Sequence, residues 1–433
     1  MKSKFTEIEQ LLDGKLEGQN VEIRGWVYRK RTSGGMLFLV VRDASDIIQV
    51  AVKKDKVHEK DFSSAEKALI ESAVEVSGLV KRDARAPNGF ELVASGLKVT
   101  HSAHAFPIAK DNSTEFLLDI RHLWIRSREI SAIMKVKSCL LEGVREFFKQ
   151  EGYFETTPPI IVSGAVEGGS TLFEMNYFGK KAFLSQSAQL YLEALIFSLG
   201  KVYSITPSFR AEKSRTLRHL AEYWHIEAEA AHADLDDMLE LEEGLLSFVC
   251  QKAARERGKE LKFLGRDPEE LKKIAPPFER LKYDEAIAIL QGKKSQIKWG
   301  DDLGTEDERI LTAEKTVPIF ITYYPKHIKA FYMKEDPDNA KLVRNNDCLA
   351  PEGYGEIIGG SQREEDVDLL IARLKEEGAD VAAYEWYLDL RRYGSVPHSG
   401  FGLGMERLVR WICKLEHIRD ATPFPRVMNR SHP

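Results

Sequence analysis

The first hundred residues alternate apolar and polar positions in short runs, and glycine, proline and asparagine separate these runs. Such alternation is typical of β-strands. The runs cover residues 21–28, 36–42, 47–52, 73–80 and 91–100, and a helix-like stretch over residues 59–72 interrupts them. Five short strands and one helix indicate a small closed barrel, of which the OB-fold is the commonest example.

Farther along the chain, the apolar spacing changes from two residues to between three and four. Residues 130–147 and 234–259 have the spacing of amphipathic helices. Strand-like runs occupy residues 155–162 and two pieces of residues 317–333, and a further helix is indicated over residues 384–393. The elements do not alternate as in a parallel α/β sheet, and no dinucleotide-binding fingerprint follows a strand. We therefore predict an antiparallel sheet flanked by helices.

The two patterns belong to different domains. Polar residues and Pro107 form a stretch without any period before the first long helix, as is typical of a linker. The chain has 433 residues, which is too long for one ordinary core. We predict an α+β protein with a barrel domain over residues 1–102, a hinge over 103–125 and a larger domain over 126–433.

Composition narrows the class of protein. Hydrophobic residues make up 43% and charged residues 30% of the chain, as in a globular protein, and no apolar run approaches the roughly 18 residues of a membrane span. The four cysteines are far apart and form no CxxC pair, which predicts reduced thiols in a cytoplasmic protein. The net charge is −5, so a nucleic acid would have to bind local basic patches.

Residues 203–229 alternate, turn through a basic run and alternate again, which predicts a long hairpin with a positive tip. Arg210 ends its first strand, and Arg218 and His219 lie on the tip. Guanidinium groups match phosphate oxygens, so this hairpin could bind a polyphosphate. The alternative is an ordinary solvated tip.

Four other regions contain candidate binding residues. On the barrel, arginines and a lysine cluster near Phe38, as in sites for single-stranded nucleic acid, although Phe38 could instead belong to the core. Asp347 and Glu356 flank a glycine-rich run and could bind Mg²⁺ or lie exposed. Glu167, in a glycine-rich loop, could bind an ammonium group or lie exposed. Alternate glycines at residues 400–404 would let a backbone or flat ring lie close.

The motifs together resemble class II aminoacyl-tRNA synthetases. FRAE and RHL of the hairpin are similar to motif 2, GFGLGMERL at residues 400–408 is similar to motif 3, and the helix and proline-bearing strand over residues 130–162 resemble motif 1, which builds a homodimer interface. GYGEIIGGSQRE at residues 353–364 is very close to asparaginyl enzymes. The chain is therefore identified as a member of the asparaginyl-tRNA synthetases, of the compact kind that resembles archaeal enzymes.

This resemblance implies a two-step reaction in which asparagine and ATP form an adenylate and tRNA(Asn) then accepts the asparagine. It implies catalytic roles for Arg210, on the α-phosphate and carboxylate, and for Arg407, on the adenine. The other implied ATP-binding residues are Glu212, Arg218, His219, Tyr223, Glu356 and Gly404, with Mg²⁺ on Asp347 and Glu356.

The resemblance also implies how the amino acid and the anticodon are bound. Glu167, Ser187 and Gln189 match residues near the α-amino group, Arg363 matches the group that receives the side-chain oxygen, and Glu227 would accept from the amide. The run at residues 38–52 looks like the family's anticodon-binding barrel. There Phe38 would stack on the middle anticodon base and Gln49 would form a hydrogen bond with it.

Three alternative functions compete with this interpretation. The nearest alternative is an aspartyl-tRNA synthetase, possibly a non-discriminating one. However, such enzymes have a lysine at the position of Leu192, and their sequence differs from GGSQRE in the glycine-rich run. A tRNA-independent ligase that makes asparagine on the same catalytic fold should lack the barrel. A non-catalytic RNA-binding module would not need motifs 2 and 3.

Overall fold

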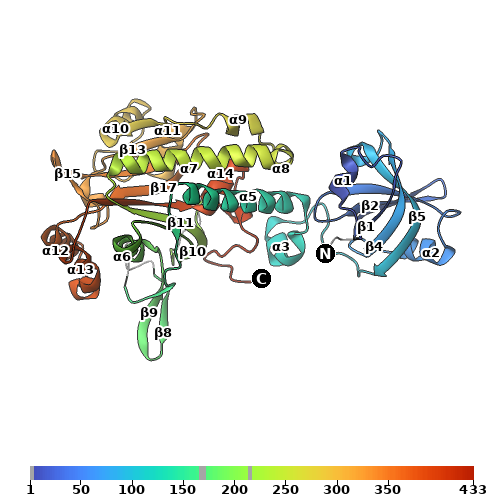
Figure 1. Ribbon diagram of the computed structural model, residues 1–433, viewed down its shortest axis with the longest axis horizontal. Coiled ribbons are helices and arrows are strands. Elements are labelled where there is room, and N and C mark those ends of the chain that lie inside the picture. The colour runs from blue at the N-terminus through green and yellow to red at the C-terminus, as the bar shows by residue number, and fades with distance from the viewer. Residues whose placement is uncertain (1–3, 165–171, 213–216) are drawn as a thin grey trace. The chain divides into compact units, whose positions relative to one another are not determined.

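A computed structural model describes residues 4–164, 172–212 and 217–433, and the chain forms two compact units, Met1–Ser113 and Thr114–Pro433 (Figure 1). Each unit has a hydrophobic core of its own. Within the described ranges, no helix combines the length and apolar character needed to cross a membrane. The two units are described separately below.

The smaller unit is the expected five-stranded closed barrel, in the order β1-β2-β3-β5-β4. Inward residues such as Val27, Leu39 and Val50 are fully buried, and they alternate with outward ones. The first strand continues to Ser33, beyond its predicted end, because Gly34 and Gly35 supply the positive φ angles of a tight turn. The elements are α1 (Ile8–Leu12), β1 (Asn20–Ser33), β2 (Met36–Arg42), β3 (Ile47–Lys53), α2 (Glu59–Lys67), β4 (Ala73–Arg82) and β5 (Phe90–His101).

The stretch predicted as a hinge contains two short helices, α3 (Thr114–Asp119) and α4 (Arg121–Trp124), which belong to the larger unit. The Arg121 side chain is buried, and its guanidinium donates hydrogen bonds to the carbonyl oxygens of Thr422 and Pro423. The end of the chain thereby fixes this segment. The exact domain boundaries stay a prediction.

The larger unit is built on an eight-stranded sheet in the order β12-β13-β16-β17-β18-β11-β10-β6. The strands in the middle pair antiparallel, as expected, whereas β12 pairs parallel with β13 and β6 pairs parallel with β10. The strands are β6 (Phe154–Glu155), β10 (Lys201–Phe209), β11 (Glu222–Ala231), β12 (Glu279–Lys282), β13 (Ile319–Thr322), β16 (Asn345–Ala350), β17 (Gly355–Gln362) and β18 (His398–Gly404).

Three helices cover one face of this sheet: α5 (Arg128–Gln150), α7 (Leu235–Glu256) and α14 (Met405–Ile412) (Figure 1). Phe148 of α5 is fully buried and stacks on Tyr203 of β10, with ring centroids 4.4 Å apart. Apolar residues at helical spacing thus pack on the apolar face of the strands. The opposite face carries the polar residues of the site.

The remaining elements surround the sheet. A three-stranded sheet of β7 (Ile161–Val162), β8 (Glu174–Tyr177) and β9 (Lys180–Leu184) precedes α6 (Gln189–Leu199), and its hairpin projects from the larger unit (Figure 1). The other elements are α8 (Gly258–Phe263), α9 (Pro268–Lys272), α10 (Tyr283–Gly292), α11 (Thr305–Thr312), β14 (Glu335–Asp336), β15 (Asn339–Val343), α12 (Val367–Glu376) and α13 (Glu385–Arg392).

Two strand predictions need correction. The strand expected over residues 155–162 is split around Pro158 and Pro159 into β6 and β7, which belong to different sheets, because proline cannot donate to a ladder. The second run within residues 317–333 is not a strand. It follows a short 3-10 turn, Lys326–Ile328, and packs Phe331 and Tyr332 against α12 and α13.

Candidate active site

Alternate residues of β11 line the site. Side chains at every second position of a strand point to the same face of the sheet. On β11 these are Tyr223, His225, Glu227 and Glu229, and the first three line cavities while Glu229 is fully buried. Of the intervening residues, Ile226 and Ala228 pack into the helix-covered core, whereas Trp224 is exposed. The predicted hairpin strand therefore carries a row of polar side chains across the open face.

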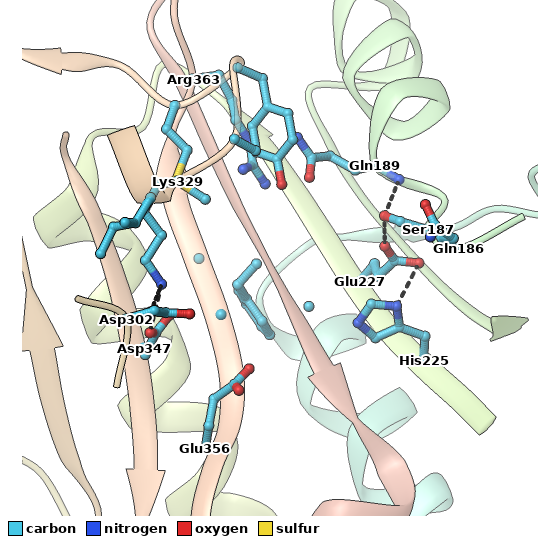
Figure 2. Close-up of a pocket in the computed structure, with 18 of the residues that line it drawn as sticks. Gln186, Ser187, Gln189, His225, Glu227, Asp302, Lys329, Asp347, Glu356 and Arg363 are labelled. Carbon is cyan, nitrogen blue, oxygen red and sulfur yellow. Dashed lines mark hydrogen bonds and ion pairs between the residues drawn. The ribbon is translucent and has the colours of Figure 1, made fainter. Parts of the chain in front are cut away.

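The larger of two cavities has a volume of about 510 Å³ and lies over the strands β11, β16, β17 and β18 (Figure 2). Ser187, Gln189 and Glu227 lie on one side of it, and Lys329 and Asp347 lie on the other (Figure 2). Arg210, Glu356 and Arg363 also line it. The cavity therefore presents hydrogen-bonding groups on one side and a set of formal charges on the other.

A smaller cavity, of about 70 Å³, adjoins the larger one. Residues that line both cavities are Arg210, His225, Glu356 and Gly402. The smaller cavity is also lined by Arg218, His219, Tyr223, Gly404 and Arg407. It thus brings the predicted motif 2 and motif 3 residues together, and the two cavities form one continuous polar site.

The Glu227 carboxylate is fixed by the two residues that precede α6. It accepts a short hydrogen bond from the Ser187 hydroxyl and one of 2.9 Å from the backbone N–H of Ala188. The His225 Nδ1 atom lies 3.5 Å away. Leu192, one turn farther along α6, does not line the cavity and packs in a buried apolar cluster with Val202 and others.

Three ion pairs occupy the charged side of the site. The Lys329 ammonium lies 2.9 Å from Asp347 Oδ2, and the Arg407 guanidinium lies 2.9 Å from Glu356 Oε2. A third pair joins Arg218 to the buried carboxylate of Glu308 on α11. Each carboxylate predicted to bind metal therefore has a cation of the protein beside it.

These pairs shift the pKa values of their members. Burial tends to raise the pKa of Glu356, but Arg407, Lys329 and Arg218 outweigh it and lower the pKa to about 2. Burial also acts on Asp347 and raises its pKa, and Lys329 only partly opposes this effect. Glu356 is thus an anion at neutral pH, which is the form that a cation or a metal ion binds.

The two predicted metal ligands face the same glycine. A Cβ atom added to Gly359 would lie 3.7 Å from Asp347 Oδ1 and 3.9 Å from Glu356 Oε1. The carboxylates face a common space because a bulge in the pairing of β16 with β17 turns Glu356 toward the cavity. Within the described parts of the chain, no three His, Cys, Asp or Glu side chains are grouped as metal ligands. Two carboxylates suit Mg²⁺, which shares its other positions with phosphates and water.

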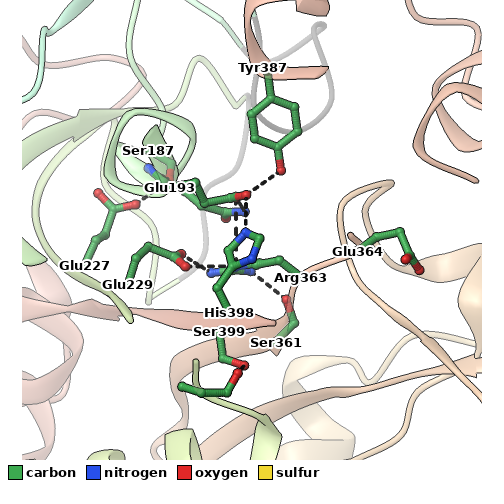
Figure 3. Close-up of polar contacts among 12 residues, drawn as sticks. Ser187, Glu193, Glu227, Glu229, Ser361, Arg363, Glu364, Tyr387, His398 and Ser399 are labelled. Carbon is green, nitrogen blue, oxygen red and sulfur yellow. Dashed lines mark hydrogen bonds and ion pairs between the residues drawn. The ribbon is translucent and has the colours of Figure 1, made fainter. Parts of the chain in front are cut away.

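A second charge network lies buried behind the side of the cavity formed by Ser187, Gln189 and Glu227, and it is centred on Glu193 of α6 (Figure 3). Its Oε2 atom accepts hydrogen bonds from Arg391 at 2.6 Å and from the Tyr387 hydroxyl at 2.7 Å, and His398 Nε2 lies 3.1 Å from it. Its Oε1 atom accepts from Gln189 Nε2 at 3.0 Å. One carboxylate thus connects a cavity residue to α13 and β18.

Arg363 belongs to the same network. Its guanidinium pairs with Glu229, donates to the Ser361 hydroxyl at 2.6 Å, and lies 4.0 Å from Glu193 (Figure 3). Burial raises the pKa of Glu229, although Arg363 opposes this effect. For Glu193 burial acts the same way, but the charge of Arg391, the hydrogen bond with His398 and the charge of Arg363 outweigh it and lower the pKa. Arg363 is therefore held rigidly where it reaches the cavity.

The alternate glycines of β18 make room for side chains of β11. A Cβ atom at Gly400 would lie 2.1 Å from Glu229 Cδ, and one at Gly402 would lie 2.4 Å from His225 Nε2. The expectation of a close approach is confirmed at these two positions, but the groups that approach are the protein's own. Only glycine fits there because contacts this short are sterically forbidden to a Cβ.

On the barrel, the Phe38 side chain points outward between the buried Leu37 and Leu39, so it does not belong to the core. The Arg31 guanidinium lies 4.8 Å from its ring centroid and also donates to Gln49 Oε1 at 3.2 Å. Gln49 is only 6% exposed and donates to Glu91 at 3.1 Å. Arg31 thus connects the two predicted anticodon residues in one outer patch.

Most predicted residues of the larger unit line one of the two cavities. Glu212 lines neither, and its carboxylate lies 3.8 Å from both Arg210 and His219. Glu167 lies outside the described residues. His225 was missed, although its place between Tyr223 and Glu227 on an alternating strand could have revealed it.

Other missed residues are Lys329, Asp302, Glu193, Glu229 and Glu308. Lys329 and Asp302 lie in irregular segments, where no period marks the face of a side chain. Glu193 and Glu308 lie on helices, and what they contact is set by tertiary packing.

Comparisons with known proteins agree with this geometry. Residues 113–428 match the family described as class II tRNA synthetases (D, K and N), and residues 21–100 match the OB-fold nucleic acid binding domain. The chain is 56% identical over 419 residues to the asparagine–tRNA ligase of Thermococcus gammatolerans, which covers 97% of both chains.

Solved structures give the same result. The asparaginyl-tRNA synthetase of Pyrococcus horikoshii, crystallised with asparaginyl-adenylate, superimposes with a TM-score of 0.96 at 54% identity and covers 100% of both chains. A putative aspartyl-tRNA synthetase from Leishmania major superimposes with a TM-score of 0.88 at 25% identity, over 100% of this chain and 96% of that one. The aspartyl fold is therefore shared, but the sequence is much closer to the asparaginyl enzyme.

Replacing Glu193 with glutamine should destabilise the larger unit. The variant keeps the shape of the side chain but leaves the buried Arg391 without its countercharge, so we expect the free energy of unfolding to fall by about 3–5 kcal/mol. Urea unfolding measures this. The control is Glu385→Gln, whose partner Arg392 is solvent-exposed and whose loss should change stability little. Equal stability of the two variants would contradict the importance of the network.

Proposed function

We propose the roles of this site on the premise that the chain belongs to the asparagine–tRNA ligases, a family of class II tRNA synthetases. In the first step, an oxygen of the asparagine α-carboxylate attacks the α-phosphorus of ATP, and pyrophosphate leaves with the electrons of the broken P–O bond. In the second step, a terminal ribose hydroxyl of tRNA(Asn) attacks the carbonyl carbon of the adenylate, loses its proton, and AMP leaves.

The observation that carries this proposal is the continuity of the two cavities. A polar pocket that suits an amino acid opens directly into a cationic pocket that suits a nucleotide, and Arg210 lines both. The reaction needs little more from the protein than in-line positioning and charge neutralisation. Arg210 therefore stands where the carboxylate of one substrate meets the α-phosphate of the other.

Asparagine occupies the side of the larger cavity near α6. Ser187 and Gln189 bind near its amino group, with Glu167 as a further ligand from its loop. Arg363 donates to the side-chain oxygen, and Glu227 accepts from the amide NH₂. The support for this pose is that hydrogen bonds and ion pairs hold Glu227 and Arg363 in place before any ligand binds.

ATP occupies the smaller cavity and the charged side of the larger one. Tyr223 and Arg407 enclose the adenine between an aromatic face and a guanidinium, with Gly404 leaving space beside them. Arg218 and His219 bind the outer phosphates. Glu212 pairs with Arg210 and His219, and it recognises the adenine or the end of the tRNA.

Asp347 and Glu356 would hold Mg²⁺. The metal, when bound, neutralises phosphate charge and orients the triphosphate. Glu356 is ionised for this purpose, and both carboxylates face the space beside Gly359. The glycine keeps that space open, since any larger side chain would fill it.

The barrel binds the anticodon of tRNA(Asn). Phe38 stacks on the middle base and Gln49 forms a hydrogen bond with it. Because Gln49 is nearly buried and already bonded to Arg31 and Glu91, it offers the base only its remaining hydrogen-bonding capacity. Phe38, which points outward, contributes the larger share of the contact.

The chain forms a homodimer through the segment that resembles motif 1. Large apolar side chains are exposed in this segment, Phe154 at 55% and Ile161 at 44%, and in the neighbouring β8–β9 hairpin, Tyr177 at 45% and Phe178 at 92%. Exposed apolar residues of this size and number in adjacent elements are typical of an interface between subunits. A second copy of the chain would cover them.

Changing Arg407 to alanine should abolish adenylate formation. Without the guanidinium, the adenine loses one of its two faces and Glu356 loses its partner. We expect asparagine-dependent ATP–pyrophosphate exchange to fall to background. The matched control is Arg410→Ala on the same helix, whose side chain stacks on Tyr354 and lines neither cavity. Exchange at the normal rate in Arg407→Ala would refute the adenine assignment.

Changing Glu227 to glutamine should reduce the choice of asparagine over aspartate. The two amino acids are nearly isosteric, so discrimination must come from charge and hydrogen bonding. The ratio of kcat/KM for asparagine to that for aspartate, measured by exchange, should fall by about a hundredfold or more. Glu222→Gln, at the exposed start of the same strand, is the control. Full discrimination by Glu227→Gln would make this account of specificity wrong.

Changing Phe38 to alanine should weaken tRNA charging and spare adenylate formation. Loss of a stacking platform costs about 1–3 kcal/mol per base, which should appear as a higher KM for tRNA(Asn). Leu79→Ala removes an exposed apolar side chain from another strand of the barrel and serves as the control. Equal loss of charging and of pyrophosphate exchange would mean that Phe38 is structural.

A further inference from the structure

Lys329 contacts a carboxylate that the proposed function assigns to a metal ion. Its ammonium lies 2.9 Å from Asp347 Oδ2 and 3.8 Å from Asp302 Oδ1, and 3.9 Å from the centroid of the Tyr324 ring. The side chain is 13% exposed and lines the larger cavity. Lys329 is thus a cation bound among anionic and aromatic groups at the edge of the triphosphate site.

Lys329 and a metal ion would compete for the Asp347 carboxylate. Lys329 contacts Oδ2, and Oδ1 faces the space beside Gly359. Mg²⁺ binds carboxylate oxygens at about 2.0–2.1 Å, so an ion on this carboxylate would lie close to the ammonium. Two cations at such a distance repel each other strongly where water is largely excluded, so the metal favours movement of the ammonium away from Asp347.

The displaced ammonium needs another anion. A buried cation without a partner is costly, so Mg²⁺ alone would bind at the expense of an unpaired Lys329. ATP removes this penalty, since its phosphates enter the cavity that Lys329 lines. The four-carbon stem of lysine is flexible and lets the ammonium turn from the carboxylate to a phosphate oxygen.

We propose that Lys329 is a stand-in for the metal at Asp347 and a phosphate ligand for ATP, so that it exchanges partners when Mg²⁺ and ATP bind together. This inference rests on the proposed function, because it takes the cavity as the triphosphate site. Its consequence is that metal and nucleotide bind cooperatively. Each ligand raises the affinity of the other by the same factor, as thermodynamic linkage requires.

The proposal predicts two effects of opposite sign for Lys329→Met. Asp347 loses the cation that competes with a metal ion. The affinity for Mn²⁺ without nucleotide, measured by electron paramagnetic resonance, should therefore rise about tenfold. The triphosphate loses its contact with the Lys329 ammonium. The affinity for α,β-methylene ATP at saturating Mg²⁺, measured by calorimetry, should therefore fall about tenfold. A residue with a merely structural role would weaken both.

Lys326→Met is the matched control, because Lys326 lies in the same turn, pairs with Glu335 at 2.8 Å and lines neither cavity. It should change neither affinity. Lys329→Gln, which removes the charge but keeps a polar end, gives a second measurement if the methionine variant does not fold. The proposal is overturned if Mn²⁺ binding without nucleotide is unchanged or weaker, or if nucleotide binding does not fall.

The wild-type protein separates this inference from the proposed function. If it shows no asparagine-dependent ATP–pyrophosphate exchange, the proposed function fails, whatever the metal measurements give. If it shows exchange and the Lys329 variants do not bind Mn²⁺ more tightly, only the partner exchange of Lys329 fails. The two outcomes therefore cannot be confused.

Discussion

The amino-acid side of the site depends on one buried carboxylate. Glu193 is fully buried and meets Gln189 one turn earlier in its own helix α6, and also Arg391 of α13 and His398 of β18, which lie 198 and 205 residues farther along the chain. A buried charge is tolerated only when partners satisfy it, so these elements must come together for the unit to fold. The same contacts fix Arg363 and Gln189 at the cavity, which couples stability to the geometry of recognition.

The nucleotide side is organised differently. Its charges form separate pairs, Asp347 with Lys329, Glu356 with Arg407 and Arg218 with Glu308, and every member except Glu308 lines a cavity. A triphosphate and a divalent cation carry both signs of charge and can replace each protein partner by one of their own. The site is therefore electrically balanced by protein groups that incoming ligands can displace, whereas Glu193 is fully buried and lines neither cavity.

The sequence predicts the local parts of this arrangement and not the pairings. The alternation of apolar and polar residues predicts β11 and places Tyr223 and Glu227 on one face. The resemblance of the sequence motifs predicts the roles of Arg210, Arg363 and Arg407. Lys329 was missed because the run that contains it reads as a strand, while Pro325 and the packing of Phe331 hold it in an irregular conformation. The partner of Arg218 was also missed, because Glu308 lies on a helix ninety residues away whose position only the folded sheet determines.

In the proposed binding mode, selection of asparagine follows from where charge is absent as much as from where it is present. Glu227 is held by the Ser187 hydroxyl and the Ala188 N–H, so its carboxylate cannot turn away from a ligand. Leu192, which replaces the lysine typical of aspartyl enzymes, is buried in an apolar cluster and supplies no compensating cation. A second carboxylate in the amide position would meet Glu227 with no nearby positive charge from α6 to offset the repulsion. The amide NH₂ instead finds an acceptor already in place, and the choice rests on the sign of an interaction between groups of nearly equal size.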